Sequence, residues 1–438
     1  MADVRPFRGV RFNPDSVGPL GGVLCPPFDE INAERRDALL ARSEHNVVRL
    51  ESPRAASEDA AIYAQSAAQL QSWLAEGVLA QDGRPAYYVM QEEFTTEDGP
   101  RRRVGVFAAV HLEDYERAIV LPHEFTRRGP KEDRLAMMEA CGANFSPIMA
   151  MYRDPGGVGT LLWEAIANRE PDCAADAPGG FNYKLWLLND DDAVARLRSL
   201  FRSSPIYIAD GHHRYETALA FRDNVRSRER VRLDTQASEF VLMCLVEFDD
   251  PGMQLNSFHR ALSGLSPDKL SALQEQVYGL FTVESRPLGG MTPERIGQFI
   301  DNTWGARHGK PALGLIEPEE GRLSVLTLRG NLGPGSLPHA PHPEMYKCEA
   351  WLLHSSVLDP VLGGSSGDQA QVEFVPELDV LLTQIDRGEC QAAFLVPPLD
   401  MAVFESLVKE GQRLPPKTTY FLPKLPTGLV MNLLTGDV

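Results

Sequence analysis

Residues 205–214 have the sequence PIYIADGHHR, and this stretch decides the class of fold that we predict for the chain. The run from Pro205 to Ala209 is short, apolar and rich in isoleucine, which predicts a buried strand. Gly211 permits a tight turn with a close approach of the backbone. The residues that follow, through Phe221, predict a helix. A buried strand that runs through a glycine turn into a helix is typical of α/β proteins.

Strand and helix patterns continue on both sides of this stretch. Two strand-like runs, Ala86–Phe94 and Val104–Leu112, predict a hairpin. Asp191–Phe201 predicts a helix that follows an acidic cap, and Glu239–Phe248 predicts another apolar strand. Pro171–Gly180 is small, acidic and rich in glycine, so we expect a surface loop there. The whole pattern predicts a mixed α/β fold.

The chain is too long for one ordinary hydrophobic core. At about 150 residues per domain, 438 residues suggest two or three domains. We place a boundary near residue 260, which separates an N-terminal part with the core of the fold (1–260) from a C-terminal mixed α/β domain (261–438).

The net charge of −18, from 43 basic and 61 acidic residues, excludes some classes of partner. An acidic surface repels phosphate backbones, so we expect neither a nucleic acid nor an anionic membrane as a partner. The first residues lack the apolar region of a signal peptide, and no apolar run is long enough to span a bilayer. The six cysteines are far apart, as scattered reduced thiols are. We therefore expect a cytoplasmic protein.

The turn at Asp210 and Gly211 carries the strongest chemical signal. His212, His213 and Arg214 place three side-chain donors in the first turn of the predicted helix, where free backbone N–H groups and the helix dipole already favour an anion. A guanidinium binds phosphate oxygens with two hydrogen bonds, so this cluster predicts a phosphate site. Two other interpretations remain open. Asp210 caps the helix and nothing more, or His212 and Glu216, four residues apart, hold a metal ion together with His213.

Two further carboxylates are candidates for catalysis. Asp29 follows two prolines in a rigid turn and precedes a helix that we predict from Glu30 to Leu40; it is either a catalytic group or a helix cap. Glu124 follows a histidine at the end of a strand, which is where general-base catalysis needs a carboxylate. Near the C-terminus, Lys417 and Lys424 belong to a basic, proline-stiffened stretch that either contacts phosphate or protects a strand edge.

Several well-known nucleotide motifs are missing from the sequence. It contains no G-x-x-x-x-G-K-[ST], no G-x-G-x-x-G after a strand and no H-E-x-x-H. A nucleotide would therefore bind without a P-loop or a dinucleotide fold.

Six motifs follow one another along the chain. They are Pro26-Pro27-Phe28-Asp29-Glu30-Ile31, Asn46-Val47-Val48-Arg49-Leu50, Pro122-His123-Glu124, Asn144-Phe145-Ser146-Pro147-Ile148, Ala209-Asp210-Gly211-His212-His213-Arg214 and Lys417-Thr418-Thr419-Tyr420-Phe421. At these motifs the sequence resembles the bacterial and archaeal domain of unknown function 1015 family. The resemblance spans nearly the whole chain, and the family has no firmly assigned reaction.

More remotely, the Asp210–Arg214 turn looks like the signature turn of the ParB/sulfiredoxin group, which includes free-serine kinases. This resemblance implies a ParB/sulfiredoxin-like core around the turn, with additional N- and C-terminal α/β parts. It also implies that the turn faces nucleotide phosphates, and that Glu124 is the counterpart of a catalytic glutamate. Sulfiredoxins have their nucleophilic cysteine where this chain has His212, so that chemistry is absent.

These observations lead to one hypothesis and two alternatives. The hypothesis is a phosphotransferase that uses ATP or ADP with Mg²⁺ and acts on a small hydroxyl-bearing metabolite, for example free serine. Gly211, His212, His213 and Arg214 would bind the phosphates, Glu124 would take the hydroxyl proton, and Asp210 would hold Mg²⁺ or orient a histidine. The alternatives are a non-enzymatic nucleotide-sensing module and a metal-dependent hydrolase that uses His212, His213 and Glu216.

Overall fold

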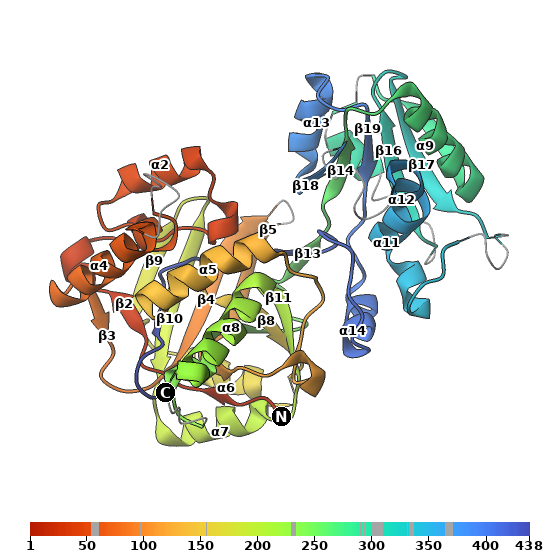
Figure 1. Cartoon of the computed structure of the whole chain (residues 1–438). Coiled ribbons are helices and arrows are strands. Elements are labelled where there is room, and N and C mark those ends of the chain that lie inside the picture. Colours follow the sequence, from red (N-terminus) through yellow and green to blue (C-terminus); the bar gives the residue numbers. More distant parts are fainter. Residues whose placement is uncertain are drawn as a thin grey trace. The chain divides into compact units, whose positions relative to one another are not determined.

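In the computed structural model the chain forms two compact units. Figure 1 shows the chain coloured from its N-terminus to its C-terminus. The first unit contains Met1–Pro122, Thr126–Gln254 and Pro423–Val438, and the second contains His123–Phe125 and Leu255–Leu422. The sequence-based boundary at 260 did not foresee that the Pro423–Val438 tail belongs with the first unit. The described residues are 1–53, 61–96, 99–154, 156–228, 234–289, 291–292, 294–299, 310–330, 332, 337–363 and 371–438.

The first unit is built on a mixed sheet, so the predicted α/β class is confirmed. In the described residues the strands lie in the order β6 (Val120–Leu121), β11 (Ile206–Asp210), β8 (Ile148–Tyr152), β12 (Phe240–Glu247), β5 (Gly99–His111), β4 (Tyr87–Thr96), β10 (Phe181–Leu188) and β9 (Cys173–Ala177), with β1 (Val4–Arg5) paired to β5. Most neighbouring strands are antiparallel, but β11 pairs with β6, and β12 with β8, in parallel.

The strand patterns predicted from the sequence are strands of this sheet. β4 and β5 form the predicted antiparallel hairpin, with Tyr88 opposite Phe107. The apolar residues of β11, from Ile206 to Ala209, are all buried, because β6 and β8 flank this strand. β11 therefore holds the turn at Gly211 firmly against the body of the unit.

Helices cover the sheet and supply its main core. α6 (Val158–Ile166), α7 (Asp191–Phe201) and α8 (His212–Arg228) bury apolar side chains in one cluster with those of β5, β8 and β12. The predicted helix Asp191–Phe201 is α7, capped by the Asp190 carboxylate, which accepts from the Ala193 amide at 3.0 Å. α8 lies beside α5 (Arg128–Cys141) in Figure 1, and both run next to the sheet.

One prediction about this sheet was wrong. The stretch Pro171–Gly180 was expected to be a loop, but its residues Cys173–Ala177 form strand β9. β9 pairs with β10 at the edge of the sheet, where Tyr183 lies opposite Ala175. Small and acidic residues lack strand propensity, so only the pairing with β10 makes this segment a strand.

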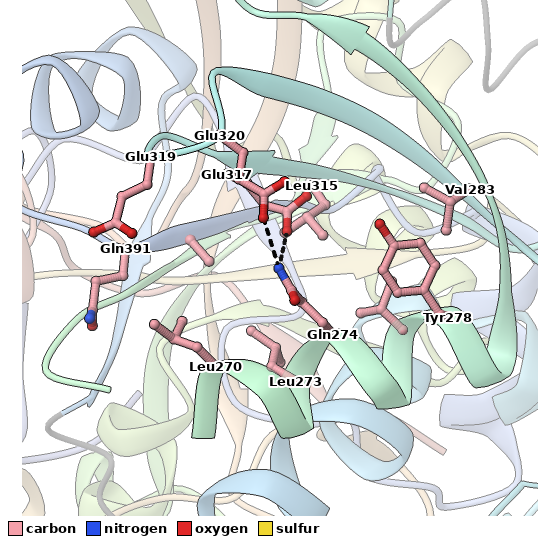
Figure 2. A pocket seen from close by; sticks show the side chains of 12 residues that line it. Leu270, Leu273, Gln274, Tyr278, Val283, Leu315, Glu317, Glu319, Glu320 and Gln391 are labelled. Carbon is pink, nitrogen blue, oxygen red and sulfur yellow. Dashed lines mark hydrogen bonds between the residues drawn. The ribbon is translucent and has the colours of Figure 1, made fainter. Parts of the chain in front are cut away.

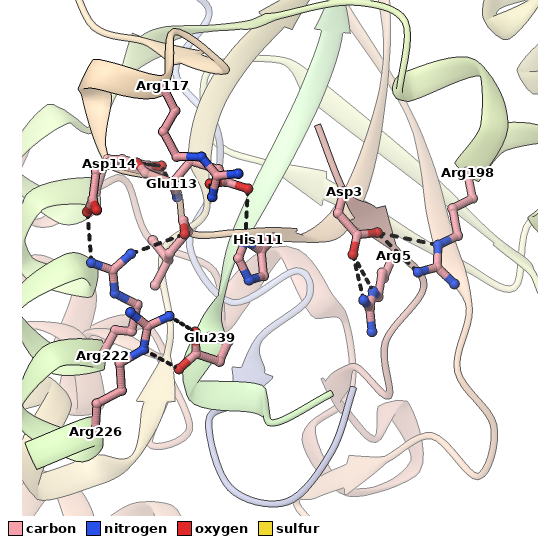
Figure 3. Close-up of polar contacts among 12 residues, drawn as sticks. Asp3, Arg5, His111, Glu113, Asp114, Arg117, Arg198, Arg222, Arg226 and Glu239 are labelled. Carbon is pink, nitrogen blue, oxygen red and sulfur yellow. Dashed lines mark hydrogen bonds and ion pairs between the residues drawn. The ribbon is translucent and has the colours of Figure 1, made fainter. Parts of the chain in front are cut away.

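Polar contacts hold the C-terminal half of α8 against the segments that flank strands β5 and β12, as Figure 3 shows. Arg226 Nε donates to the fully buried carboxylate of Glu239 at 2.8 Å. Arg222 Nη2 donates to Asp114 at 2.8 Å, and its Nη1 donates to the Leu112 carbonyl at 3.1 Å. With its far end held in this way, α8 keeps its N-terminus in a fixed position at the end of β11.

The second unit has an antiparallel sheet of its own. α13 (Leu378–Asp386) packs Leu381 and Ile385 against one face of this sheet, where Ile316 and Leu323 complete a core. The described strands lie in the order β15 (Phe281–Pro287), β17 (Arg322–Leu328), β16 (Ala312–Glu317), β19 (Ala392–Leu395), β14 (His259–Leu262) and β18 (Val372–Val375).

Other helices of the second unit include α9 (Pro267–Leu280), α11 (Glu349–Leu353) and α14 (Met401–Lys409). α9 begins at a proline and is capped by Ser266, whose hydroxyl accepts from the Lys269 amide at 3.3 Å. A single π-helical turn, His354–Leu358, follows α11. Within the described residues, none of the helices has both the length and the hydropathy needed to cross a lipid bilayer.

Candidate functional site

Five segments that are far apart in the sequence meet near the end of β11 in the first unit. Ser146 Oγ lies 2.8 Å from a Glu51 carboxylate oxygen and 2.7 Å from Thr427 Oγ1. The Thr427 amide donates to the Cys25 carbonyl at 2.8 Å. Arg214 donates to the carbonyl of Pro147. Residues of the Asn144–Ile148 and Ala209–Arg214 motifs, together with Cys25, Glu51 and the C-terminal tail, therefore form one connected polar region.

Gly211 makes the turn between β11 and α8 possible. Its φ of +99° lies in the region that side chains disfavour. A Cβ atom at this position would also lie 3.0 Å from Cζ of Arg214, which folds back over the turn. The glycine thus lets the Arg214 guanidinium pack directly against the backbone at the start of α8.

Asp210 is paired with two cations at this turn. Its carboxylate accepts a hydrogen bond from Arg214 Nη2 at 2.5 Å and another from Lys424 Nζ. Burial alone would raise the pKa of Asp210, but the positive charges of Lys424 and Arg214 outweigh burial and hold this pKa well below its ordinary value. Asp210 is therefore ionised at neutral pH, and its partners are partly neutralised.

Arg214 has structural partners in addition to its predicted role. The side chain is nearly buried, and it bridges Asp210 on its own turn to the carbonyl of Pro147, just before β8. These contacts hold β11, α8 and the Asn144–Ile148 motif together. Phosphate binding by Arg214 stays a prediction.

The two histidines of the turn have different environments. His212 is buried, and its positive electrostatic influence also lowers the pKa of Asp210. His213 is half-buried, and its Nε2 accepts a hydrogen bond from the Arg127 amide at 2.9 Å. Because an accepting nitrogen carries no proton, this contact places the proton of a neutral His213 on Nδ1. Their contacts with phosphate stay predictions.

Asp29 and Glu30 lie in the short 3₁₀ turn η2 (Phe28–Glu30), and both act electrostatically on Lys424. Asp29 is exposed, whereas Glu30 is half-buried. The helix that was expected from Glu30 begins only at Ala33, because the Asn32 side chain caps it by accepting from the Arg35 amide at 2.8 Å. Asp29 is thus no cap for this helix, and its catalytic role stays a prediction.

Glu30 is a candidate that the sequence analysis missed. Burial raises the pKa of Glu30, and the nearby Lys424 charge only partly offsets this effect. One of its oxygens, Oε1, is buried without a hydrogen-bond partner in the described part of the chain, and Oε2 lies 3.6 Å from Arg35 Nη1. A carboxylate with a raised pKa and an unused oxygen is suited to accept a proton. The sequence offered only the adjacency of Glu30 to Asp29 as a signal.

Glu124 lies in the segment His123–Phe125, which belongs to the second unit. The neighbouring His123 is buried, and its ring packs on Phe404 and lies 2.8 Å from Thr419 Oγ1. This histidine thereby connects two of the sequence motifs, Pro122–Glu124 and Lys417–Phe421. The role of Glu124 as a general base stays a prediction.

The described residues do not form the metal site that one alternative requires. No group of three or more histidine, cysteine, aspartate or glutamate side chains in these residues is placed to hold a metal ion. Glu216, the expected partner of His212, instead accepts from Thr126 Oγ1 and, at 2.8 Å, from Lys131 Nζ. A hydrolase with His212, His213 and Glu216 as metal ligands therefore lacks support.

Solved structures with some similarity to this chain are distant. A free serine kinase variant in complex with AMP shares 14% identity at a TM-score of 0.36, over 73% of this chain and 87% of that one. A conserved hypothetical protein from Pyrococcus furiosus shares 16% identity at a TM-score of 0.34, over 76% of this chain and 94% of that one. SbnI with a C-terminal truncation, from Staphylococcus aureus, shares 13% identity at a TM-score of 0.35, over 72% of this chain and 82% of that one.

The family of the chain follows from its sequence. No curated protein matches the chain. The family described as Protein of unknown function (DUF1015) matches residues 4–332, which include five of the six sequence motifs and the whole of the Asp210–Arg214 turn. This match covers well over half of the chain and confirms the family resemblance, so the chain belongs to the DUF1015 family.

Proposed function

We propose that the first unit binds a nucleotide at the N-terminus of α8 and transfers a phosphoryl group from it to a hydroxyl of a small metabolite. The observation that carries this proposal is the charged cluster at the first turn of α8. There, Lys424 contacts Asp210 and lies within the electrostatic reach of Asp29 and Glu30. A cation, a helix N-terminus and a carboxylate with a raised pKa are the groups that phosphoryl transfer requires.

The residues have distinct roles in this proposal. The Gly211 turn and the histidines would hold the phosphates at the start of α8. Lys424 would neutralise the negative charge on the phosphoryl group in the transition state. The hydroxyl oxygen of the acceptor forms the new bond to phosphorus, while the bond between phosphorus and the nucleotide's bridging oxygen breaks. Glu30 would take the proton from that hydroxyl. We assign this role to Glu30 because its pKa is raised and its Oε1 is unused.

Mg²⁺ usually accompanies nucleotide phosphates, and it would lower the negative charge on them. Asp29 and Asp210 offer the carboxylate oxygens that this ion prefers as ligands. Because the described residues contain no three-ligand group, most of its remaining ligands would be phosphate oxygens and water.

The direct test uses the full chain with labelled ATP or ADP, Mg²⁺ and a panel of small hydroxyl compounds that includes free serine. We expect a phosphorylated acceptor from the wild type and at least a hundredfold lower rate from Glu30→Gln and Lys424→Met. Glu93→Gln and Lys184→Met are matched controls, since this pair also forms an ion pair at 3.0 Å in the first unit but is part-exposed.

The outcomes separate the hypotheses. Nucleotide binding without transfer to any acceptor would favour the nucleotide-sensing module over the enzyme. Transfer that is unchanged in Glu30→Gln but lost in Glu124→Gln would return the role of base to Glu124. A chain that binds neither ATP nor ADP would refute the proposal.

A further inference from the structure

The second unit contains a cavity of about 70 Å³ between α9 and its sheet. Figure 2 shows the side chains that line it. Leu270, Leu273 and Val277 come from α9, Leu315 comes from β16, and Ala392 comes from β19. With Val283 of β15, six of the twelve lining residues are aliphatic, and Tyr278 and Gln391 also form part of the wall.

These aliphatic side chains are out of water but do not fill the space between them. Leu273, Val277 and Leu315 are each at most 4% exposed, yet the cavity remains. Protein interiors are normally packed as densely as organic crystals, and an unfilled apolar gap costs stability. A short alkyl group would fill this gap, because a cavity of about 150 Å³ accommodates benzene and this one has about half that volume.

One side of the cavity is lined by carboxylates. Glu317, Glu319 and Glu320 all lie there, and Gln274 Nε2 donates to Glu317 Oε1 and Glu320 Oε1, both at 3.1 Å. Figure 2 shows the Gln274 amide between these two carboxylates. Arg322 pairs with Glu317 at 2.8 Å and with Glu320 at 2.7 Å. Three carboxylates and one guanidinium leave this rim negatively charged.

We propose that this cavity binds a small aliphatic primary amine, with the alkyl chain between α9 and the sheet and the ammonium group at the carboxylate rim. Charge complementarity selects this class of ligand. The rim would repel a carboxylate or phosphate head group, and a neutral alkyl compound would gain the apolar contacts only. Glu319 and Glu320 are exposed, so the ammonium group keeps contact with water while the alkyl chain is buried. The site is independent of the function proposed for the first unit.

The test compares three ligands of equal chain length on the full chain at constant ionic strength: n-butylammonium, n-butanol and butyrate. Calorimetry and ligand-observed NMR should show saturable binding of n-butylammonium at one site per chain, at least tenfold tighter than that of butyrate. Glu319→Gln combined with Glu320→Gln should reduce this preference at least threefold. Glu284→Gln, an exposed carboxylate on β15, should leave the preference unchanged.

Ala392→Leu should fill the cavity and abolish binding of n-butylammonium, and Leu273→Phe provides a second filling variant if the first does not fold. Absence of saturable n-butylammonium binding would overturn the proposal. Equal binding of n-butanol would show a cavity without selection for charge, and would overturn the assignment to an amine. Undiminished binding in a folded cavity-filling variant would place the ligand elsewhere and would also overturn it.

Discussion

Each unit buries an arginine in a strand of its sheet, but the two guanidinium groups have different partners. Arg103 of β5 is fully buried and pairs with the equally buried carboxylate of Glu92 on β4 at 2.5 Å. Arg260 of β14 is also fully buried, yet no described carboxylate pairs with it. Its donors point instead to the carbonyls of Phe258 and Pro416, and Nε lies 3.2 Å from Nε2 of His354.

The difference shows two ways of burying a positive charge. In the first unit an anion compensates the cation, both at Arg103 and at the proposed site, where Asp210 faces Arg214 and Lys424. In the second unit, carbonyl dipoles and a neutral imidazole replace the anion, and the Arg260 guanidinium also lies 4.9 Å from the centre of the Phe374 ring. Loss of the carboxylate should therefore lower the stability of the fold at the Arg103 and Asp210 sites. At the Arg260 site, protonation of the His354 imidazole should lower it.

The largest effect should come from Glu92→Gln. This change leaves Arg103 buried without an anion, and we expect a loss of about 3–5 kcal/mol in the free energy of unfolding. Chemical denaturation of the full chain measures it. Glu93→Gln, on the same strand and in the part-exposed pair with Lys184, should cost less than about 0.5 kcal/mol. Equal effects of the two changes would mean that burial of the Arg103 pair is not decisive.

Asp210→Asn should have a smaller effect on stability, about 1–3 kcal/mol, because the Asp210 pairs are partly open to water. The pKa of Asp210 is lowered in the folded chain, so its contribution is present at neutral pH and is lost as the pH falls below its ordinary value of 3.8. The difference between variant and wild type should therefore shrink in acid. Asp223→Asn, an exposed ion-paired residue of α8, is the control. A difference that persists undiminished at low pH would contradict this account.

Arg260→Met should cost only about 1 kcal/mol. The change leaves two carbonyl groups without a donor, but it also removes a buried charge that has no anionic partner, and the two effects offset each other. Equilibrium unfolding compared with Arg387→Met, a largely exposed arginine, measures the cost. A loss as large as that of Glu92→Gln would show that the dipoles around Arg260 stabilise it as strongly as a carboxylate does.

The smallest effect should be a change in pH dependence. Burial and the Arg260 charge lower the pKa of His354 to about 3, below its ordinary 6.5, so protons bind more readily to the unfolded chain. The stability that neutral His354 contributes is thus complete above pH 6.5 and is lost as the pH falls from there toward 3. In His354→Gln, the fall in stability over this interval should be shallower than in the wild type. Exposed His339→Gln should leave the slope unchanged, and an unchanged slope in His354→Gln would refute the prediction.

Local patterns predicted much of the fold. The hairpin β4–β5, the helix α7 and the strand–turn–helix of β11 and α8 follow from hydrophobic periodicity, caps and one glycine, all of which act between near neighbours in the chain. Strand β9 was not predicted, because its residues form a strand only through pairing with β10. Glu30 was not predicted as a site residue, because its pKa depends on burial and on Lys424. Neither is visible in the motif Pro26–Ile31.

By itself, the sequence determined that β11 ends in Asp210, that Gly211 turns the chain, and that a helix follows with two histidines and an arginine. Residue type and short-range spacing are sufficient for these features, because backbone freedom and helix initiation are local. Only the tertiary structure decided which charges meet at this turn. Lys424 is 214 residues from Asp210 in the sequence, and it is part of the first unit because β21 (Asn432–Leu433) of the tail pairs with β7 (Ala143–Asn144). The pKa of Asp210 and of Glu30 depends on that long-range pairing.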